Sequence, residues 1–296
     1  MDLYFYSYRW RTIWRRQYAQ YKADFKDKIQ KLFENLDDES IKTANSLLTS
    51  NLETSHFGLI KDMIKSYVDF KVSSSQNPNR TIKSKYILGN KTKPDFYLLA
   101  YKNGFSYIED AYSMYVSGKD FIDGGAYVGD SAVVLNELNP KSIHCFEPNK
   151  KNYDFLKKTI ELNNLDDIVF AKELGLSDEC TSIFFKGSSV RARVSQAETK
   201  NQVDVMTIDK YVEDNNLNIG LIKLDVESLE YNVILGAEKT IKTQKPVLLI
   251  SIYHTLKDFL EIKPLIESFS DDYSFMIKPS HCYSLNLEFM LIAVPK

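Results

Sequence analysis

The segment FIDGGAYVGD, which begins at Phe121, constrains the fold of this chain more than any other part of it. A short apolar run ends in Asp123, and Gly125 and Gly129 then supply a turn in which the backbone can approach a ligand closely. A second apolar run leads to Glu147, 24 positions after Asp123. A carboxylate at the end of the second strand of such a unit can accept hydrogen bonds from both hydroxyls of a ribose. The spacing therefore predicts a nucleoside site.

The dinucleotide-binding fingerprint GxGxxG is absent from this loop, and Tyr127 stands where many nucleoside-binding loops have their middle glycine. A glycine in the middle of the loop would make room for a pyrophosphate. A bulky ring at this position, beside a carboxylate, instead favours a ligand that lacks phosphate and carries positive charge. S-adenosylmethionine, with a ribose, an amino group and a sulfonium, meets both conditions. The other interpretation is a tight strand-to-helix turn that binds no ligand.

The order of apolar and polar runs predicts three regions: a helical N-terminal appendage at 1–80, a bridging segment at 81–118 and an S-adenosylmethionine-binding methyltransferase domain at 119–296. In the last region strands alternate with helices, which predicts an α/β fold with a doubly wound, mostly parallel, seven-stranded sheet of the class I methyltransferase, Rossmann-like type. The short loop between the last two strands requires a C-terminal antiparallel hairpin. The strand candidates are 120–123, 142–146, 167–171, 219–224, 246–252, 273–278 and 287–294.

Ligands of open α/β sheets bind outside the carboxyl ends of the strands, so the residues at these ends are the candidate site. Asp225, Glu227 and His254 are the predicted catalytic residues, because histidine is the default base for a hydroxyl acceptor and Asp225 ends a strand. Glu230, three residues after Glu227, belongs to the same acidic cluster, and with His254 these carboxylates could also hold a magnesium ion, although no spacing demands a metal. The predicted cofactor contacts are Asp123, Gly125, Ala126, Tyr127, Gly129, Asp130, Glu147, Pro148, Leu176, Ser177 and Asp225.

Six sequence blocks in order, between Asp120 and Lys296, resemble the FkbM family of S-adenosylmethionine-dependent methyltransferases. Ser228 replaces the glycine of the family block KxDxEGxE, which puts the local backbone at issue because glycine tolerates conformations that serine does not. The resemblance implies O-methylation of a sugar or glycoconjugate hydroxyl, as in polysaccharide biosynthesis. The blocks are FIDGGAYVGD, IHCFEPNKKNYDFLKKTIELNN, TIDKY, LIKLDVESLEYNVILGAEKTI, PVLLISIYHTLKDF and HCYSLNLEFMLIAVP.

Four further residues are predicted to contact the acceptor. Tyr253 follows the fifth strand directly, and His281 lies in the turn of the final hairpin, within a block shared with the family. Arg191 and Arg193 lie in Lys186–Gln202, the longest irregular stretch of the catalytic half, and could clamp an anionic group. The alternative for both arginines is a solvated loop.

The N-terminal residues show helical spacing of apolar side chains at 3–36, 38–52 and 57–70. Tyr4–Arg16 interleaves arginines with aromatic residues. This pattern favours packing on another domain, or on another copy of the chain in a homo-oligomer, over contact with membrane headgroups.

The composition limits the partners. A formal net charge of −2, from 38 basic and 40 acidic residues, provides no general attraction for nucleic acid. Three cysteines without a CxxC pair argue against a disulfide framework and a zinc site, so a reducing compartment is expected. No run of 18 apolar residues exists, so no membrane span is predicted and the expected location is cytoplasmic.

Two other functions stay open at this point. A nicotinamide-dependent oxidoreductase would use the same crevice, but the absent fingerprint and the terminal hairpin disfavour it. A non-catalytic cofactor-binding or assembly module would keep the fold without turnover, and Ser228 together with the large helical appendage leaves room for it.

Overall fold

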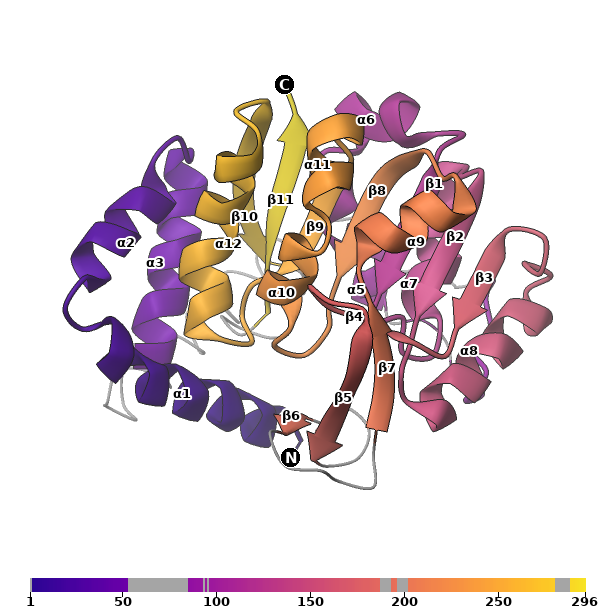
Figure 1. Ribbon diagram of the computed structural model, residues 1–296, viewed down its shortest axis with the longest axis horizontal. Coiled ribbons are helices and arrows are strands. Elements are labelled where there is room, and N and C mark those ends of the chain that lie inside the picture. The colour runs from indigo at the N-terminus through magenta and orange to yellow at the C-terminus, as the bar shows by residue number, and fades with distance from the viewer. Residues whose placement is uncertain are drawn as a thin grey trace.

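The computed structural model describes residues 2–52, 85–92, 94, 96–186, 193–195, 202–279 and 288–296, and no side chains at 2–9, 50, 96–97, 185–186 and 193–195. Its described strands form a main sheet of seven and a second sheet of four. Figure 1 shows helices on both sides of the main sheet, so the molecule has three layers.

The main sheet confirms the predicted fold class. Its spatial order is β10-β11-β9-β8-β1-β2-β3, and all neighbouring strands are parallel except β11, which is antiparallel to both β9 and β10. The direction of winding reverses between β1 and β8, which is the position where ligands bind in such sheets. The strands are β1 (Asp120–Gly124), β2 (Ser142–Phe146), β3 (Val169–Lys172), β8 (Ile219–Leu224), β9 (Val247–Ser251), β10 (Tyr273–Pro279) and β11 (Phe289–Pro295).

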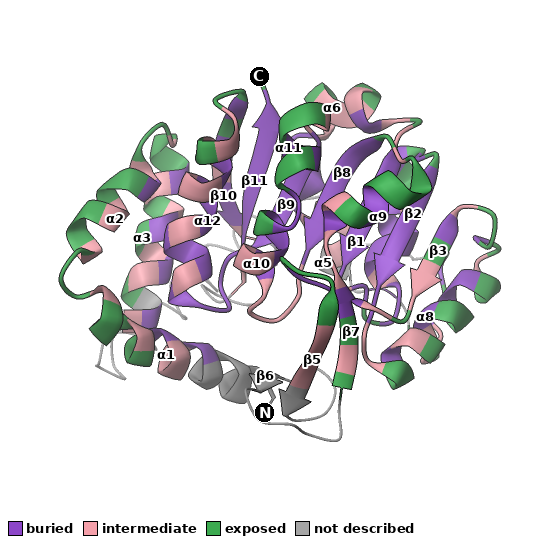
Figure 2. Cartoon of the chain, in the orientation of Figure 1, coloured by how far each residue is buried: buried purple, intermediate pink, exposed green. Residues whose placement is uncertain are grey.

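Alternate side chains of these strands enter two cores, one on each face of the sheet. In β1, Phe121 belongs to the core beneath α7 and α8, whereas Ile122 belongs to the core beneath α9–α12. Figure 2 shows the buried strands between helices whose outer faces are exposed. The helices of this domain are α7 (Asp130–Leu135), η2 (Asn136–Leu138), α8 (Lys150–Leu162), α9 (Ile208–Asn215), α10 (Glu230–Leu235), α11 (Glu238–Gln244) and α12 (Leu256–Phe269).

Three N-terminal helices, α1 (Asp2–Tyr21), α2 (Phe25–Phe33) and α3 (Asp38–Leu52), pack against α12 and β10. Trp14 of α1 lies in the same core as Phe259 of α12, with their ring centroids 5.1 Å apart. Ser40 Oγ accepts a hydrogen bond from the backbone N–H of Ile277 at 3.0 Å, so α3 covers the outer strand of the sheet. The N-terminal helices therefore pack on another domain, as predicted, and that domain belongs to the same chain.

Other N-terminal predictions are not decided by the structure. The expected helix at 57–70 and the boundary at residue 80 lie outside the described residues, and contact between copies of the chain stays a prediction. Among the helices that the structure describes, none is long and apolar enough to cross a membrane.

The bridging segment is more helical than the sequence indicated. It contains α5 (Phe96–Tyr101), η1 (Lys102–Tyr107) and α6 (Glu109–Val116). Its tyrosines attach it to the domain, since the hydroxyls of Tyr107, Tyr112 and Tyr115 donate to the carbonyl oxygens of Pro279, Pro295 and Lys245.

The second sheet was not predicted. Its order is β4-β7-β5-β6, and it projects past the carboxyl ends of the main sheet, on the side where α1 lies (Figure 1). The expectation of an irregular stretch over Lys186–Gln202 is wrong at 193–195, which form a strand, and at its two ends, which belong to the neighbouring strands; 187–192 and 196–201 lie outside the described part. The strands are β4 (Gly175–Leu176), β5 (Thr181–Lys186), β6 (Arg193–Ser195) and β7 (Gln202–Met206).

Candidate active site

The loop after β1 is held between the carboxyl ends of β2 and β8. The backbone N–H groups of Gly125 and Ala126 both donate to the carbonyl oxygen of Phe146 at 3.0 Å, and the N–H of Asp225 donates to the carbonyl oxygen of Gly124 at 3.0 Å. Gly125 has a φ of +76°, and a Cβ there would lie 1.8 Å from the Asp225 carbonyl oxygen. Only glycine fits this position, because both the conformation and the space exclude a side chain.

Glu147 connects this loop to the start of α8. Its Oε2 accepts the backbone N–H of Tyr127 at 3.0 Å, and its Oε1 accepts that of Asn149 at 2.8 Å. Burial raises the pKa of Glu147 to about 7, against the opposing effect of these hydrogen bonds. The ring of Tyr127 is 39% exposed beside it.

Asp123 lies beneath the loop. Its Oδ1 is 3.0 Å from Lys223 Nζ, and both side chains are almost completely buried. The two residues are opposite each other in the pairing of β1 with β8. Lys223 Nζ also donates to the carbonyl oxygen of Gly125 at 3.0 Å, so the pair supports the loop from below. Among the described residues, none donates a well-directed hydrogen bond to Asp123 Oδ1, since the ion pair has a suitable distance but not a suitable angle.

Two further carboxyl groups lie near this pair. Burial raises the pKa of Asp130, at the start of α7, to about 6, and Asp123 acts in the same direction. Partial burial also raises the pKa of Asp225, although the charges of His254 and Lys223 oppose this effect. The positive charge of buried Lys223 interacts with all four carboxyl groups of this region, which are Asp123, Asp130, Asp225 and Glu147. The loop region is therefore rich in negative charge.

The turn after β8 is organised by Glu230. Its Oε1 accepts the N–H of Val226 at 2.8 Å, and its Oε2 accepts that of Ser228 at 3.0 Å. Between them, Glu227 and Ser228 have φ values of +57° and +92°. Ser228 thus occupies a left-handed conformation that glycine adopts without strain, which explains why the family has glycine here.

His254 lies next to this turn and is completely buried. Its Nδ1 is 2.7 Å from Glu230 Oε1, and its Nε2 is 3.4 Å from Asp225 Oδ1. Burial lowers the pKa of His254, but Glu230 and Asp225 together outweigh it and raise the pKa to about 10. The ring is therefore an imidazolium at neutral pH and cannot accept a proton in that state.

Asp225, Glu230 and His254 are also the described group whose ligand atoms, within 4.8 Å of one another, could surround a metal ion. Glu230 and His254 Nδ1 already form a hydrogen bond with each other, and both Glu230 oxygens accept backbone N–H groups, so these atoms are not free to bind a metal. His254 Nε2 and Asp225 alone would fill only a small part of a magnesium shell, which consists mainly of oxygen. The cluster is better described as an ion-pair network.

The remaining predicted residues lie in different surroundings. Tyr253 is 5% exposed and packs against Trp10, and Leu176 and Ser177 are buried at the end of β4. Pro148 and Glu227 are half-buried. Arg193 is in β6, but its side chain is not described, and Arg191 and His281 lie outside the described residues.

Sequence reasoning placed Glu230 only in the acidic cluster that could hold magnesium, and it assigned no site role to Lys223 or Trp10. Glu230 had a local signal, because it lies three residues after Glu227 and can share its helix face. Trp10 had none, because its contact with His254 joins distant parts of the chain.

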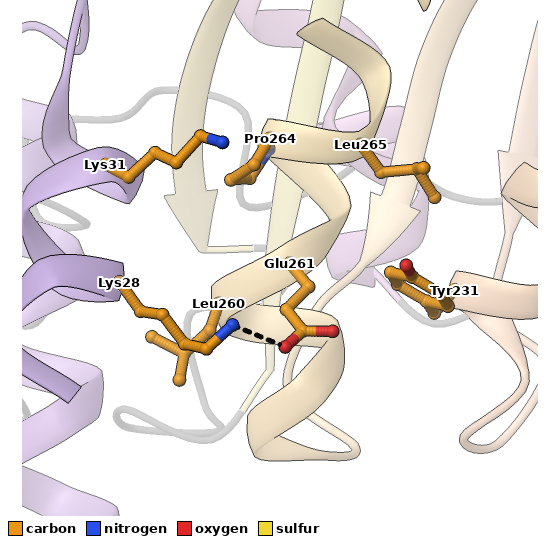
Figure 3. A pocket seen from close by; sticks show the side chains of 7 residues that line it. All are labelled: Lys28, Lys31, Tyr231, Leu260, Glu261, Pro264 and Leu265. Carbon is orange, nitrogen blue, oxygen red and sulfur yellow. Dashed lines mark hydrogen bonds and ion pairs between the residues drawn. The ribbon is translucent and has the colours of Figure 1, made fainter. Parts of the chain in front are cut away.

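A pocket lies apart from these residues, between α2, α10 and α12 (Figure 3). Lys28 forms an ion pair with Glu261 across it at 2.9 Å, and none of the predicted site residues lines it. Its lining residues are Lys28, Lys31, Tyr231, Leu260, Glu261, Pro264 and Leu265.

The sheet order, with one antiparallel strand near its edge, and the ligand edge at β1 and β8 define a class I methyltransferase fold. The model of the methyltransferase FkbM domain matches residues 123–276, which is just over half of the chain. The chain therefore belongs to the FkbM methyltransferase family. The predicted resemblance is confirmed, and the family to which the chain belongs is one of methyltransferases.

One solved structure has the same fold. Methyltransferase FkbM from Methylobacillus flagellatus KT has 17% sequence identity and a TM-score of 0.60, covering 95% of this chain and 60% of that one. This chain thus spans about 60% of the length of that protein. An O-methyltransferase from Bacillus cereus in complex with SAH has 12% identity and a TM-score of 0.40, and the match covers 84% of this chain and 95% of that one. No curated protein matches the chain.

Proposed function

We propose that this protein is an S-adenosylmethionine-dependent O-methyltransferase that methylates a hydroxyl of a sugar or glycoconjugate. The observation that carries the proposal is the excess of carboxylates over cations where β1 and β8 end, in a chain of the FkbM family. A cationic donor is complementary to such an edge. The family match also favours this activity over a nicotinamide-dependent oxidoreductase.

The residues fit the donor in two respects. Asp130 forms no ion pair with another described residue, so its carboxylate would hold the ammonium group, with Asp123 behind it. Glu147, which still has lone pairs on both oxygens, would accept the ribose hydroxyls beside Tyr127. S-adenosylmethionine supplies the electrophilic methyl group when it is bound.

Asp225 is the residue that we assign to the acceptor hydroxyl. Its side chain is 37% exposed, whereas His254 behind it is completely buried. A carboxylate with a raised pKa is a stronger base than an ordinary one, and the adjacent imidazolium would orient it. His254 was predicted to be the base itself; because it is protonated and enclosed, we propose an orienting role instead. Glu227, beside Asp225 in the turn, stays a predicted contributor.

The acceptor remains defined only by its class. Tyr253, His281, Arg191 and Arg193 stay predicted acceptor contacts, and a cytoplasmic location without nucleic-acid partners stays a prediction. A glycan acceptor agrees with the family resemblance and with the need for a base near a hydroxyl.

Calorimetry with S-adenosylhomocysteine and with NADH and NADPH tests the donor class. We expect binding of the first alone, and at least tenfold weaker binding in Asp130→Asn and Glu147→Gln, a change of about 1.4 kcal/mol. Glu161→Gln removes one exposed carboxylate from α8 and is the control.

Transfer of a labelled methyl group to a panel of glycans tests the acceptor. Donor binding without transfer to any hydroxyl compound would instead support the non-catalytic module.

A further inference from the structure

We propose that α1 forms a wall of the active site and that Trp10 is a positioning residue, which holds the ring of His254 between Glu230 and Asp225. The inference rests on the proposed role of Asp225. It goes beyond the family domain, because α1 precedes the matched residues 123–276.

One face of α1 contacts the segment that follows β9. Trp10, Trp14 and Gln17 are spaced by four and three residues, so they share a side of the helix. Trp14 Nε1 donates to the carbonyl oxygen of Tyr253 at 3.0 Å, and Gln17 Oε1 accepts the N–H of Leu256 at 2.8 Å. Figure 1 shows α1 passing beneath the carboxyl ends of the parallel strands. The helix is thus fixed to the loop that carries His254.

Trp10 closes the space around the His254 ring. The two ring centroids are 4.7 Å apart with an interplanar angle of 61°, and Tyr253 lies against the imidazole with its centroid at 4.1 Å. Trp10 is only 2% exposed and His254 is not exposed at all. The indole therefore excludes water from one side of the imidazole.

The hydrogen bond to Glu230 alone does not fix the imidazole plane, because small changes in the two side-chain torsions tilt the ring while Nδ1 stays near Oε1. Contacts with Trp10 and Tyr253 restrict this motion and keep Nε2 within 3.4 Å of Asp225 Oδ1, which is the distance of an ion pair without a directed hydrogen bond. The orientation of Asp225, the more exposed partner, depends in turn on His254. Trp10 acts on the reacting group through this chain of contacts.

Low solvent access also strengthens the ion pairs of His254. The charged groups that face it are Glu230 of α10 and Asp225 and Glu227 of the turn, and Asp258 of α12 lies within range of its charge. Their attraction to an imidazolium is larger where water is excluded. Loss of the indole admits water, which relieves the burial that lowers the pKa of His254 but also screens the carboxylates that raise it. Because the carboxylates outweigh burial in the wild type, we expect a net fall in the affinity of His254 for its proton.

The test uses the full chain with isotope-labelled histidine. NMR titration of the wild type, with the His254 signal assigned through His254→Gln, gives the pKa of His254, and calorimetry gives the affinity for S-adenosylhomocysteine. We expect the pKa of His254 to fall by about one unit or more in Trp10→Ala and to stay close to wild type in Trp10→Phe, which keeps an aromatic ring. Arg16→Ala, on an exposed position of α1, is the control and should change neither quantity.

The affinity for S-adenosylhomocysteine should stay within about twofold in all these variants, because Trp10 does not contact the donor in this proposal. An unchanged pKa of His254 in folded Trp10→Ala would overturn the inference. If Trp10→Ala does not fold, Trp10→Leu decides in the same way, since it keeps apolar volume without a ring. Failure of the wild type to bind S-adenosylhomocysteine would refute the proposed function, whereas the NMR result would still decide the role of Trp10.

Discussion

Glu230 and His254 form an ion pair, 2.7 Å between Oε1 and Nδ1, in which neither side chain is exposed. The same carboxylate accepts two backbone N–H groups of the turn after β8. One side chain thus shapes the turn and fixes the histidine. Because its charge is satisfied by three donors, its removal should affect both stability and the site.

Glu230→Gln should destabilise the protein by about 3 kcal/mol, since it leaves His254 without its buried counter-charge and places an amide N–H₂ against a backbone N–H. Urea denaturation measures the change. The double variant Glu230→Gln/His254→Gln should lose less than the sum of the single changes, because the two residues interact directly. Additive losses would show that the pair is not coupled.

Ser228→Gly should stabilise the protein by about 0.5 to 1 kcal/mol. Serine at a φ of +92° is strained by about 1–2 kcal/mol, whereas the added freedom of glycine in the unfolded chain costs about 0.4–1 kcal/mol. The midpoint of urea denaturation should rise without a change in slope. A lower midpoint would mean that a contact of the serine side chain outweighs the strain.

His144 makes the stability of the fold depend on acid pH. Its Nε2 lies 2.8 Å from Ser142 Oγ, and its Nδ1 lies 2.8 Å from the hydroxyl oxygen of Tyr211. Burial lowers the pKa of His144 to about 4. Since the folded pKa lies below the unfolded value of about 6.5, the neutral ring contributes stability above pH 6.5 that is lost as the pH falls toward 4.

We therefore expect the free energy of unfolding to fall by about 2 kcal/mol more in the wild type than in His144→Phe between pH 7 and 4.5. Phenylalanine keeps the stacking with Phe170 but does not titrate. Urea denaturation at a series of pH values provides the measurement. Parallel pH curves for the two proteins would remove His144 as the cause.

The sequence predicted what depends on local pattern. All seven strands of the main sheet lie where apolar runs end in turns or polar residues, because a buried strand needs such a run. The positions of Glu147 and Asp225, directly after β2 and β8, also agree with the sequence, whereas their roles at the site stay predictions from the rule that strand ends face the ligand. These predictions used spacing along the chain, which the sequence displays directly.

What the sequence did not predict depends on contacts between distant residues. Nothing near Trp10 indicates that it meets His254, since that contact requires α1 to lie across the far end of the sheet. The burial of Asp123 against Lys223 is similar, because it follows from the register of β1 with β8. The second sheet was missed since its strands are short and partly exposed, so their alternation is weak.

Asp130 and Glu147 lead to a prediction about protons released on donor binding. Burial raises their pKa values to about 6 and about 7, so both are partly protonated near pH 6.5. A cation beside Asp130, and ribose hydroxyls donating to Glu147, favour the ionised forms and lower both pKa values. Binding of S-adenosylmethionine should therefore release protons, and its affinity should rise between about pH 5.5 and 7.5.

Calorimetry at pH 6.5 in two buffers with different ionisation enthalpies measures this release. We expect a net release in the wild type and a smaller one in Glu147→Gln and Asp130→Asn, because each variant removes one titrating group. S-adenosylhomocysteine keeps the ammonium group and the ribose but lacks the sulfonium charge, so it should also release protons. If the two buffers gave the same enthalpy, neither carboxyl would change its protonation on binding, and their assignment to the donor would have to be abandoned.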